Sequence, residues 1–146
     1  MAAAIFRAQV EAGGEGAQWR IESAGTWGVD GSPASALAQT VMTQRGITLD
    51  GHIARTVDQE LLRDADVIVV MTRSHRDALV AEFPNVREKL YLISELNGFE
   101  YDVADPYGRP RATYEACAET LEQLITRGSA RVAQWANASA ARLENV

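Results

Sequence analysis

The stretch Val67-Ile68-Val69-Val70-Met71-Thr72 decides the fold class, because an unbroken apolar run leads directly into a residue type that caps helices. A continuous β-branched run is typical of a strand buried on both faces of a parallel sheet. Thr72 carries the hydroxyl that commonly caps a helix N-terminus, so we predict a helix after it that stops at Pro84. A buried strand that passes directly into a helix is typical of an α/β domain with a parallel sheet.

Strand and helix patterns alternate along the rest of the chain. Helices are predicted over residues 1–11, from Ser32 and Pro33 to Gly46, after a capping box of Thr56 and Gln59, and along the apolar face of Tyr114, Cys117, Leu121, Leu124 and Ile125. Residues 19–23 alternate in polarity and residues 90–93 form an apolar run, which predicts two further strands. We therefore expect a three-layer α/β domain: a short parallel sheet of strands near 19–23, 67–71 and 90–93, with 67–71 central, flanked by helices.

Composition and charge restrict the classes of partner. The 146 residues are 47% hydrophobic and 23% charged, which is ordinary for one soluble globular domain. The net charge of −6 argues against nucleic acid or an anionic membrane as a partner, and no apolar run is long enough to span a bilayer. The start of the chain does not have the pattern of a secretion signal, and a single cysteine, Cys117, excludes an intrachain disulfide framework. Both features predict a cytoplasmic location.

The stretch Ala104-Asp105-Pro106-Tyr107-Gly108 is the candidate for chemistry. Asp105 stands between a run with aromatic residues (Phe99, Tyr101) and a turn made rigid by proline. A carboxylic acid beside an aromatic wall is well placed to protonate a leaving oxygen. Asp-Pro is also a common turn signal without any catalytic role, and the loop by itself leaves both interpretations open.

Several stretches match one protein family in the right order. They are Met1-Ala2-Ala3-Ala4-Ile5-Phe6, Ile21-Glu22-Ser23-Ala24-Gly25-Thr26, His52-Ile53-Ala54-Arg55, Ala65-Asp66-Val67-Ile68-Val69-Val70-Met71-Thr72 and Asp105-Pro106-Tyr107. Through these motifs the chain resembles the low-molecular-weight protein-tyrosine phosphatases over nearly its whole length. The resemblance implies a single phosphatase-like domain over residues 1–146 and the family's four-stranded parallel sheet.

The resemblance also assigns roles to individual residues. It implies hydrolysis of phosphotyrosine-type monoesters through a phosphocysteine, without a metal or other cofactor, on a phosphotyrosine protein or a small aryl phosphate. Asp105 would be the general acid, Trp27 and Tyr107 would be walls of the substrate cleft, and Ser23 and His52 would brace the phosphate-binding loop. Simpler interpretations remain beside these roles: Trp27 as ordinary packing, Ser23 as a turn residue and His52 as a satisfied core histidine.

The family's phosphate-binding loop, a Cys, five further residues and Arg-Ser, has no counterpart in the sequence. Position 123, where Cys117 would need its Arg, is Gln, and Cys117 lies on the apolar face of a predicted helix, where a buried structural thiol is expected. Met1 aligns with a Met that follows the loop in the family, so the loop and the first strand are expected upstream of residue 1. That strand is expected between 19–23 and 67–71; without it both have an unpaired edge, which a second chain could fill in a homodimer.

Two classes of function follow from these observations. In the first, the chain is an N-terminally truncated phosphatase, inactive as given because its nucleophile is missing. In the second, it is a non-catalytic interaction module or the product of a decayed gene. The related thiol-dependent arsenate reductases form a third class, which would require further redox cysteines beside Cys117.

Overall fold

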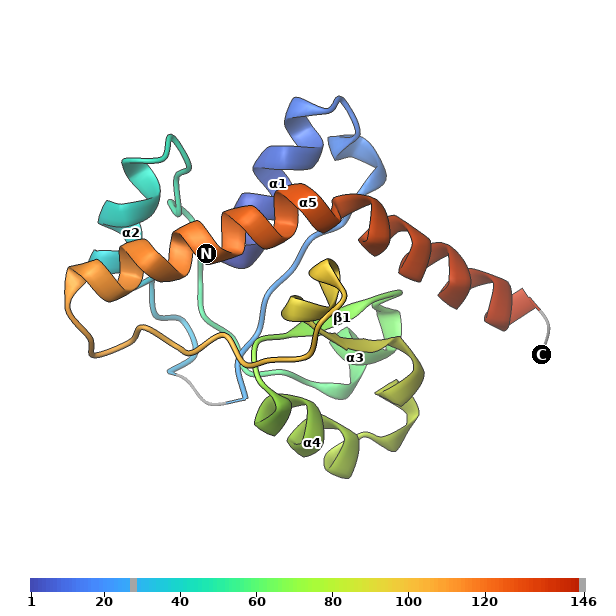
Figure 1. Cartoon of the computed structure of the whole chain (residues 1–146). Coiled ribbons are helices and arrows are strands. Elements are labelled where there is room, and N and C mark those ends of the chain that lie inside the picture. Colours follow the sequence, from blue (N-terminus) through green and yellow to red (C-terminus); the bar gives the residue numbers. More distant parts are fainter. Residues whose placement is uncertain (27–28, 145–146) are drawn as a thin grey trace. The chain divides into compact units, whose positions relative to one another are not determined.

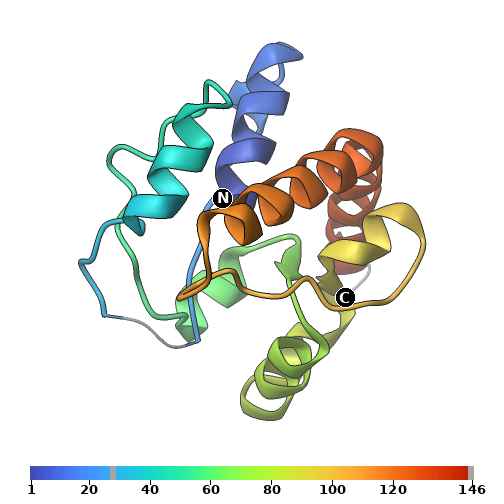
Figure 2. The same cartoon turned by 60° about the vertical axis from the view of Figure 1, so that its left-hand side comes forward.

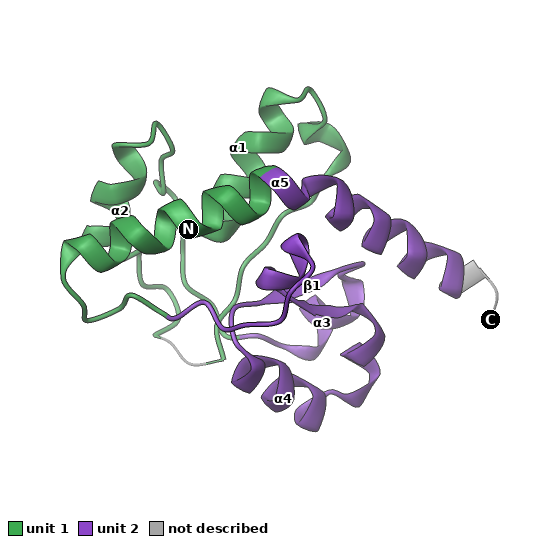
Figure 3. Ribbon diagram, in the orientation of Figure 1, with its two compact units in different colours: residues 1–56, 105–126 green, residues 57–104, 127–146 purple. Residues whose placement is uncertain are grey.

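The computed structural model describes residues 1–26 and 29–144 and divides into two compact units. Unit 1 consists of residues 1–56 and 105–126, and unit 2 of residues 57–104 and 127–146 (Figure 3). The long C-terminal helix α5, Arg111–Glu144, contributes its first half to unit 1 and its second half to unit 2. None of the helices in the described part of the chain is both long and apolar enough to cross a membrane.

Unit 1 is helical. It contains α1 (Ala2–Ala12), a short 3-10 turn η1 (Gly16–Gln18), α2 (Ala36–Thr43) and the first half of α5. The helices α1 and α2 both lie beside this half of α5 (Figure 2). Gln9 of α1 donates to the Ile125 carbonyl at 3.5 Å, and Arg45 donates to the Glu115 carbonyl at 3.2 Å. The core of the unit is formed by buried apolar residues on these three helices: Ile5, Val10, Val41, Met42, Leu121, Leu124 and Ile125.

Unit 2 contains the parallel sheet (Figure 1). It consists of α3 (Gln59–Asp64), β1 (Ile68–Val70), α4 (Arg73–Glu82), η2 (Pro84–Lys89), β2 (Leu90–Leu92), η3 (Ile93–Asn97) and the second half of α5. β1 pairs with β2 in parallel, with Val69 opposite Tyr91. The unit's core cluster comprises Leu62, Val70, Leu79, Val86, Leu90 and Leu92. An α/β fold with a short parallel sheet and flanking helices is therefore confirmed.

Helix starts were predicted with mixed success. Thr72 caps α4 as expected, because its Oγ1 accepts a hydrogen bond from the His75 N–H at 3.2 Å. The predicted capping box at Thr56 is wrong: Asp58 caps α3 and accepts from the Leu61 N–H at 2.8 Å. Likewise, α2 is capped by Ser35 and not by Ser32.

The strand predicted over residues 19–23 is wrong. These residues form no ladder, and an isolated parallel bridge joins Gly25 to Thr56 instead. Backbone carbonyls of the segment accept from arginine side chains: Ile21 from Arg7 at 2.7 Å and Ser23 from Arg55 at 3.4 Å. The prediction of a central strand at 67–71 is wrong as well, since β2 is the only strand paired with β1 among the described residues.

The second half of α5 contacts the rest of unit 2 through residues spaced along one helix face. Gly128 lies against Leu96 of η3, and the Trp135 ring stacks on Tyr91 with 4.0 Å between ring centroids. One helix turn beyond Gly128, Arg131 donates to the Glu95 carbonyl at 2.6 Å. The helix predicted from the apolar face of Tyr114 to Ile125 therefore continues through residues 132–143.

Candidate active site

Unit 1 carries a hollow of about 320 Å³ at the first turn of α1. Its lining comes from the start of α1, residues 22–23, the start of α2 and the loop 48–55. Ser23 and His52, which were predicted to brace a phosphate-binding loop, both belong to this lining. The fold therefore brings Ser23 and His52 to the same hollow, and their bracing role stays a prediction.

Arginine side chains define the electrostatics of the hollow. Glu22 is held between Arg20, at 2.6 Å, and Arg55, and hydrogen bonds from these two arginines lower the pKa of its carboxyl group. Arg55 also donates from Nε to the Ser23 carbonyl, and Arg7 reaches the Ile21 carbonyl from α1. These bonds fasten residues 21–23, which have no strand partner, and they leave the hollow with both positive and negative groups on its wall.

The side chains of His52 and Ser23 are exposed. The His52 N–H donates to the Leu49 carbonyl at 3.1 Å in a backbone turn, and the imidazole makes no hydrogen bond within the described chain. Its exposure contradicts the alternative interpretation of His52 as a core histidine. Both side chains are thus free to meet a ligand or a further segment at the hollow.

The loop with Asp105 has a well-defined local structure. Asp105 Oδ1 accepts from the Tyr107 N–H at 2.9 Å, and the Pro106 carbonyl accepts from the Arg109 N–H at 2.9 Å. Such a side-chain turn fixes one carboxylate oxygen, and the residue as a whole is exposed. Tyr107 is 76% exposed, as an aromatic wall for a ligand must be. Asp105 and Tyr107 do not belong to the described lining of the hollow, and Trp27 lies outside the described residues.

Cys117 lies on α5 in unit 1 and is partly buried. Burial raises the pKa of its thiol; the nearby α-amino group of Met1 opposes this rise, and the Asp105 carboxylate adds to it. Burial in turn lowers the pKa of the Met1 amino group. A thiol with a raised pKa is protonated at neutral pH and is a poor nucleophile, so Cys117 has the properties of a structural cysteine.

Sequence reasoning missed several residues that hold the site. Arg55 was noticed within a motif, but nothing in the sequence pattern indicated that it would bind Glu22 and the Ser23 carbonyl. Asp102, which precedes Asp105 by three residues, was also missed. Hydrogen bonds from the Arg73 N–H and from the Arg73 side chain lower the pKa of the Asp102 carboxyl group. Among the described residues, no group of His, Cys, Asp or Glu side chains is arranged to hold a metal ion.

Comparisons with known proteins identify the family of the chain. The family model "Low molecular weight phosphotyrosine protein phosphatase" matches residues 1–137. The low molecular weight protein-tyrosine-phosphatase Wzb of Escherichia coli K12 is 34% identical over 82% of this chain and 76% of its own length. A protein-arginine-phosphatase of Geobacillus stearothermophilus is 33% identical over 73% of this chain and 72% of its own. The solved structure of a low molecular weight protein tyrosine phosphatase from T. tengcongensis is 38% identical with a TM-score of 0.81, over 86% of this chain and 85% of that one.

Proposed function

Because this chain belongs to the low molecular weight phosphotyrosine protein phosphatase family, we propose that residues 1–146 act as a single phosphatase-like domain for phosphotyrosine-type monoesters. Asp105 is its general acid, and Tyr107 and Trp27 are walls of its substrate cleft. The observation that carries the proposal is the Asp105-Pro106-Tyr107 turn, in which Asp105 and Tyr107 are exposed, in a chain that matches the family model over residues 1–137. Ser23 and His52 brace the phosphate-binding loop at the hollow.

The proposed reaction proceeds in two steps through a cysteine thiolate supplied by that loop. The thiolate attacks phosphorus, a P–S bond forms and the P–O bond breaks, while Asp105 transfers its proton to the leaving phenolate oxygen. Water then attacks the phosphocysteine; the Asp105 carboxylate takes a proton from this water, and the thiolate leaves as inorganic phosphate forms. Asp105 therefore acts first as acid and then as base.

The 146 residues by themselves contain no Cys-x₅-Arg loop, and this observation favours a second proposal for the chain as given. Backbone N–H groups around the phosphate oxygens are usually the largest catalytic term, and a thiolate is the nucleophile. Without them, Asp105 has no reaction to assist. We therefore expect the isolated chain to be inactive towards aryl phosphates and to act, if at all, as a binding module.

A leaving-group comparison tests the role of Asp105. A strand and a Cys-x₅-Arg-Ser loop are joined ahead of Met1, and turnover is measured with phenyl phosphate and with p-nitrophenyl phosphate. Phenolate is a poor leaving group and needs a proton, whereas p-nitrophenolate leaves far more readily. Asp105→Asn should lower kcat for phenyl phosphate by about 10²-fold to 10⁴-fold and affect p-nitrophenyl phosphate much less. The matched control is Asp77→Asn on the exposed face of α4.

Equal losses on both substrates, or no loss on either, would show that Asp105 is not the acid. The same preparation separates the two activities named for the relatives, protein-tyrosine and protein-arginine phosphatase. We expect release of phosphate from phosphotyrosine and not from phosphoarginine. The unextended chain is the control for inactivity: turnover that iodoacetamide abolishes would identify Cys117 as an unexpected nucleophile.

A further inference from the structure

The segment directly ahead of Asp105 is fastened to unit 2 by a buried hydroxyl. Ser94 of η3 is completely buried, and it is the one polar residue in the described core. Its Oγ donates to the Tyr101 carbonyl at 2.7 Å and accepts from the Tyr101 N–H at 3.0 Å. One side chain thus satisfies both backbone groups of Tyr101, much as a neighbouring strand would.

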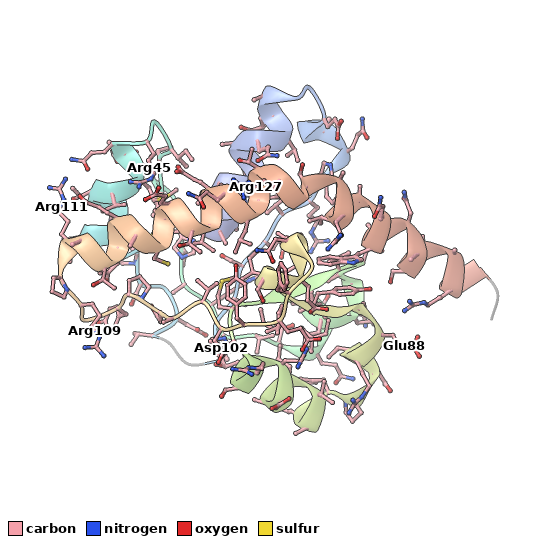
Figure 4. The ribbon with its side chains drawn as sticks, viewed as in Figure 1. Arg45, Glu88, Asp102, Arg109, Arg111 and Arg127 are labelled. Atoms are coloured by element: carbon pink, nitrogen blue, oxygen red, sulfur yellow. The ribbon has the colours of Figure 1, made fainter. Side chains whose placement is uncertain are left out.

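The next two residues are fastened as well. Asp102 Oδ1 accepts from the Arg73 N–H at 2.9 Å and from Arg73 Nε at 3.0 Å, which ties Asp102 to the first turn of α4 (Figure 4). The Val103 N–H donates to the Met71 carbonyl at 2.9 Å, directly after β1, and the Val103 side chain is buried. The backbone from Tyr101 to Val103 is therefore held by bonds at each residue.

Only Ala104 separates this fastened segment from Asp105. Two residues of extended chain span at most about 7 Å, so the backbone of Asp105 is confined to a small volume around Val103. A general acid must lie within hydrogen-bond reach of the oxygen that it protonates, and a displacement of about 1 Å can reduce the rate about 100-fold. Bonds that hold residues 101–103 therefore restrict where the acid can be.

We propose that Ser94 and Asp102 are positioning residues that hold the backbone ahead of Asp105 in one conformation. The inference rests on the proposed function of Asp105 as the general acid. A purely structural role for Asp102, as an extra cap of α4, makes a different prediction. In that case, any loss of capping at α4 would change the backbone order of the loop that contains Asp105 as much as the loss of Asp102 does.

Thr72 provides the matched control, because it caps the same helix through the His75 N–H. The test uses the 146-residue chain, labelled with ¹⁵N. Ser94→Ala and Asp102→Ala should lower the backbone order parameters of Asp105 and Tyr107 from about 0.85 to below about 0.6. They should also speed hydrogen exchange at the Val103 N–H at least tenfold. Thr72→Ala should weaken α4 and leave these order parameters unchanged, while Asp102→Asn, which keeps an acceptor oxygen, should restore much of the rigidity.

Unchanged order parameters at Asp105 and Tyr107 in Asp102→Ala would overturn the inference, as would an equal effect of Thr72→Ala. Asp102 is exposed, so its variants decide the matter even where Ser94→Ala fails to fold. In the loop-restored protein, Asp102→Ala should lower kcat for phenyl phosphate at least tenfold at unchanged KM. If Asp105→Asn loses no rate there, the proposed function fails; if it loses rate but Asp102→Ala leaves the loop rigid, only the positioning role fails.

Discussion

Gly128→Ala tests the close approach of α5 to η3 in unit 2. A Cβ at position 128 would lie 2.5 Å from the Leu96 Cβ, 2.9 Å from the Leu96 carbonyl oxygen and 3.1 Å from the Leu96 Cα. Carbon atoms in contact prefer a separation of about 3.5 to 4.0 Å, so the helix or Leu96 must move by about 1 Å. The obstructing atoms are backbone and Cβ atoms, and no change of side-chain rotamer removes them.

Two opposing terms set the size of the effect. Alanine favours a helix interior over glycine by about 1 kcal/mol. Overpacking of a filled site costs about 1 to 3 kcal/mol, and Leu96 is buried in a short helix with little room to shift. Because backbone atoms obstruct the site, the overpacking cost should lie in the upper part of this range, about 2 to 3 kcal/mol. After the gain in helix propensity is subtracted, we expect Gly128→Ala to lower the free energy of unfolding by about 1 to 2 kcal/mol, although the same exchange stabilises an ordinary helix.

Gly13 at the end of α1 supplies the control. Its φ is −78°, and a Cβ there would meet only the Gln9 and Val10 carbonyls at 3.6 Å, an ordinary contact distance. Gly13→Ala should therefore be neutral or stabilising by up to about 1 kcal/mol. Urea unfolding followed by circular dichroism gives both midpoints, with the slope m as a check on the unfolded state. If Gly128→Ala proves as stable as Gly13→Ala, α5 and η3 do not approach each other as described.

Burial raises the pKa of the Cys117 thiol, so iodoacetamide at pH 7 should alkylate the folded chain more slowly than the urea-unfolded chain; equal rates would contradict its position on α5. Hydrogen bonds from the Arg73 N–H and side chain lower the pKa of Asp102 in the folded state. The ionised Asp102 carboxylate should therefore stabilise the fold from pH 7 down to about pH 3.9, the ordinary pKa of an aspartate, and this stabilisation should disappear as the pH falls through the lowered pKa. A carboxyl-carbon NMR titration should find that Arg73→Ala raises this pKa part of the way back, since the backbone bond remains. Lys89→Met should lower the free energy of unfolding by about 1 to 3 kcal/mol, because Lys89 Nζ donates to the Arg63 and Ala65 carbonyls at the end of α3. An unchanged urea midpoint would contradict this and would show that water can satisfy the two carbonyls in place of the ammonium group.

Features that depend on neighbouring residues were predicted well from the sequence. The β-branched run before Thr72 gave both β1 and the start of α4, because strand propensity and an N-cap act over only a few residues. The errors at α2 and α3 arose where two capping residue types stand close together. In the structure, Ser35 caps α2 in place of the predicted Ser32, and Asp58 caps α3 in place of the predicted Thr56. The Thr56 hydroxyl donates instead to Asp30 Oδ1 at 2.9 Å, a partner that is distant in the sequence.

Features that depend on distant partners were not predictable in this way. Alternating residues at 19–23 satisfy the pattern of a strand, but a strand also needs a neighbour, and here arginine side chains take up the carbonyls of Ile21 and Ser23. The same limit applies to Ser94. Nothing in the run Ile93-Ser94-Glu95 indicates that its hydroxyl is buried and bound to the backbone of Tyr101. The role of Asp105 was predicted from its motif and stays a prediction, whereas the bonds that hold the backbone ahead of it are visible only in the structure.

These supporting bonds determine what orders the backbone ahead of the proposed acid. The atoms that hold residues 101–103 belong to Ser94, Met71 and Arg73, which are all residues of this chain. The conformation ahead of Asp105 therefore does not depend on phosphate or on a thiolate for its hydrogen bonds. A phosphate-binding loop supplied to this chain would meet an acid whose backbone is already ordered, so the entropy of ordering it would not have to be offset by substrate binding.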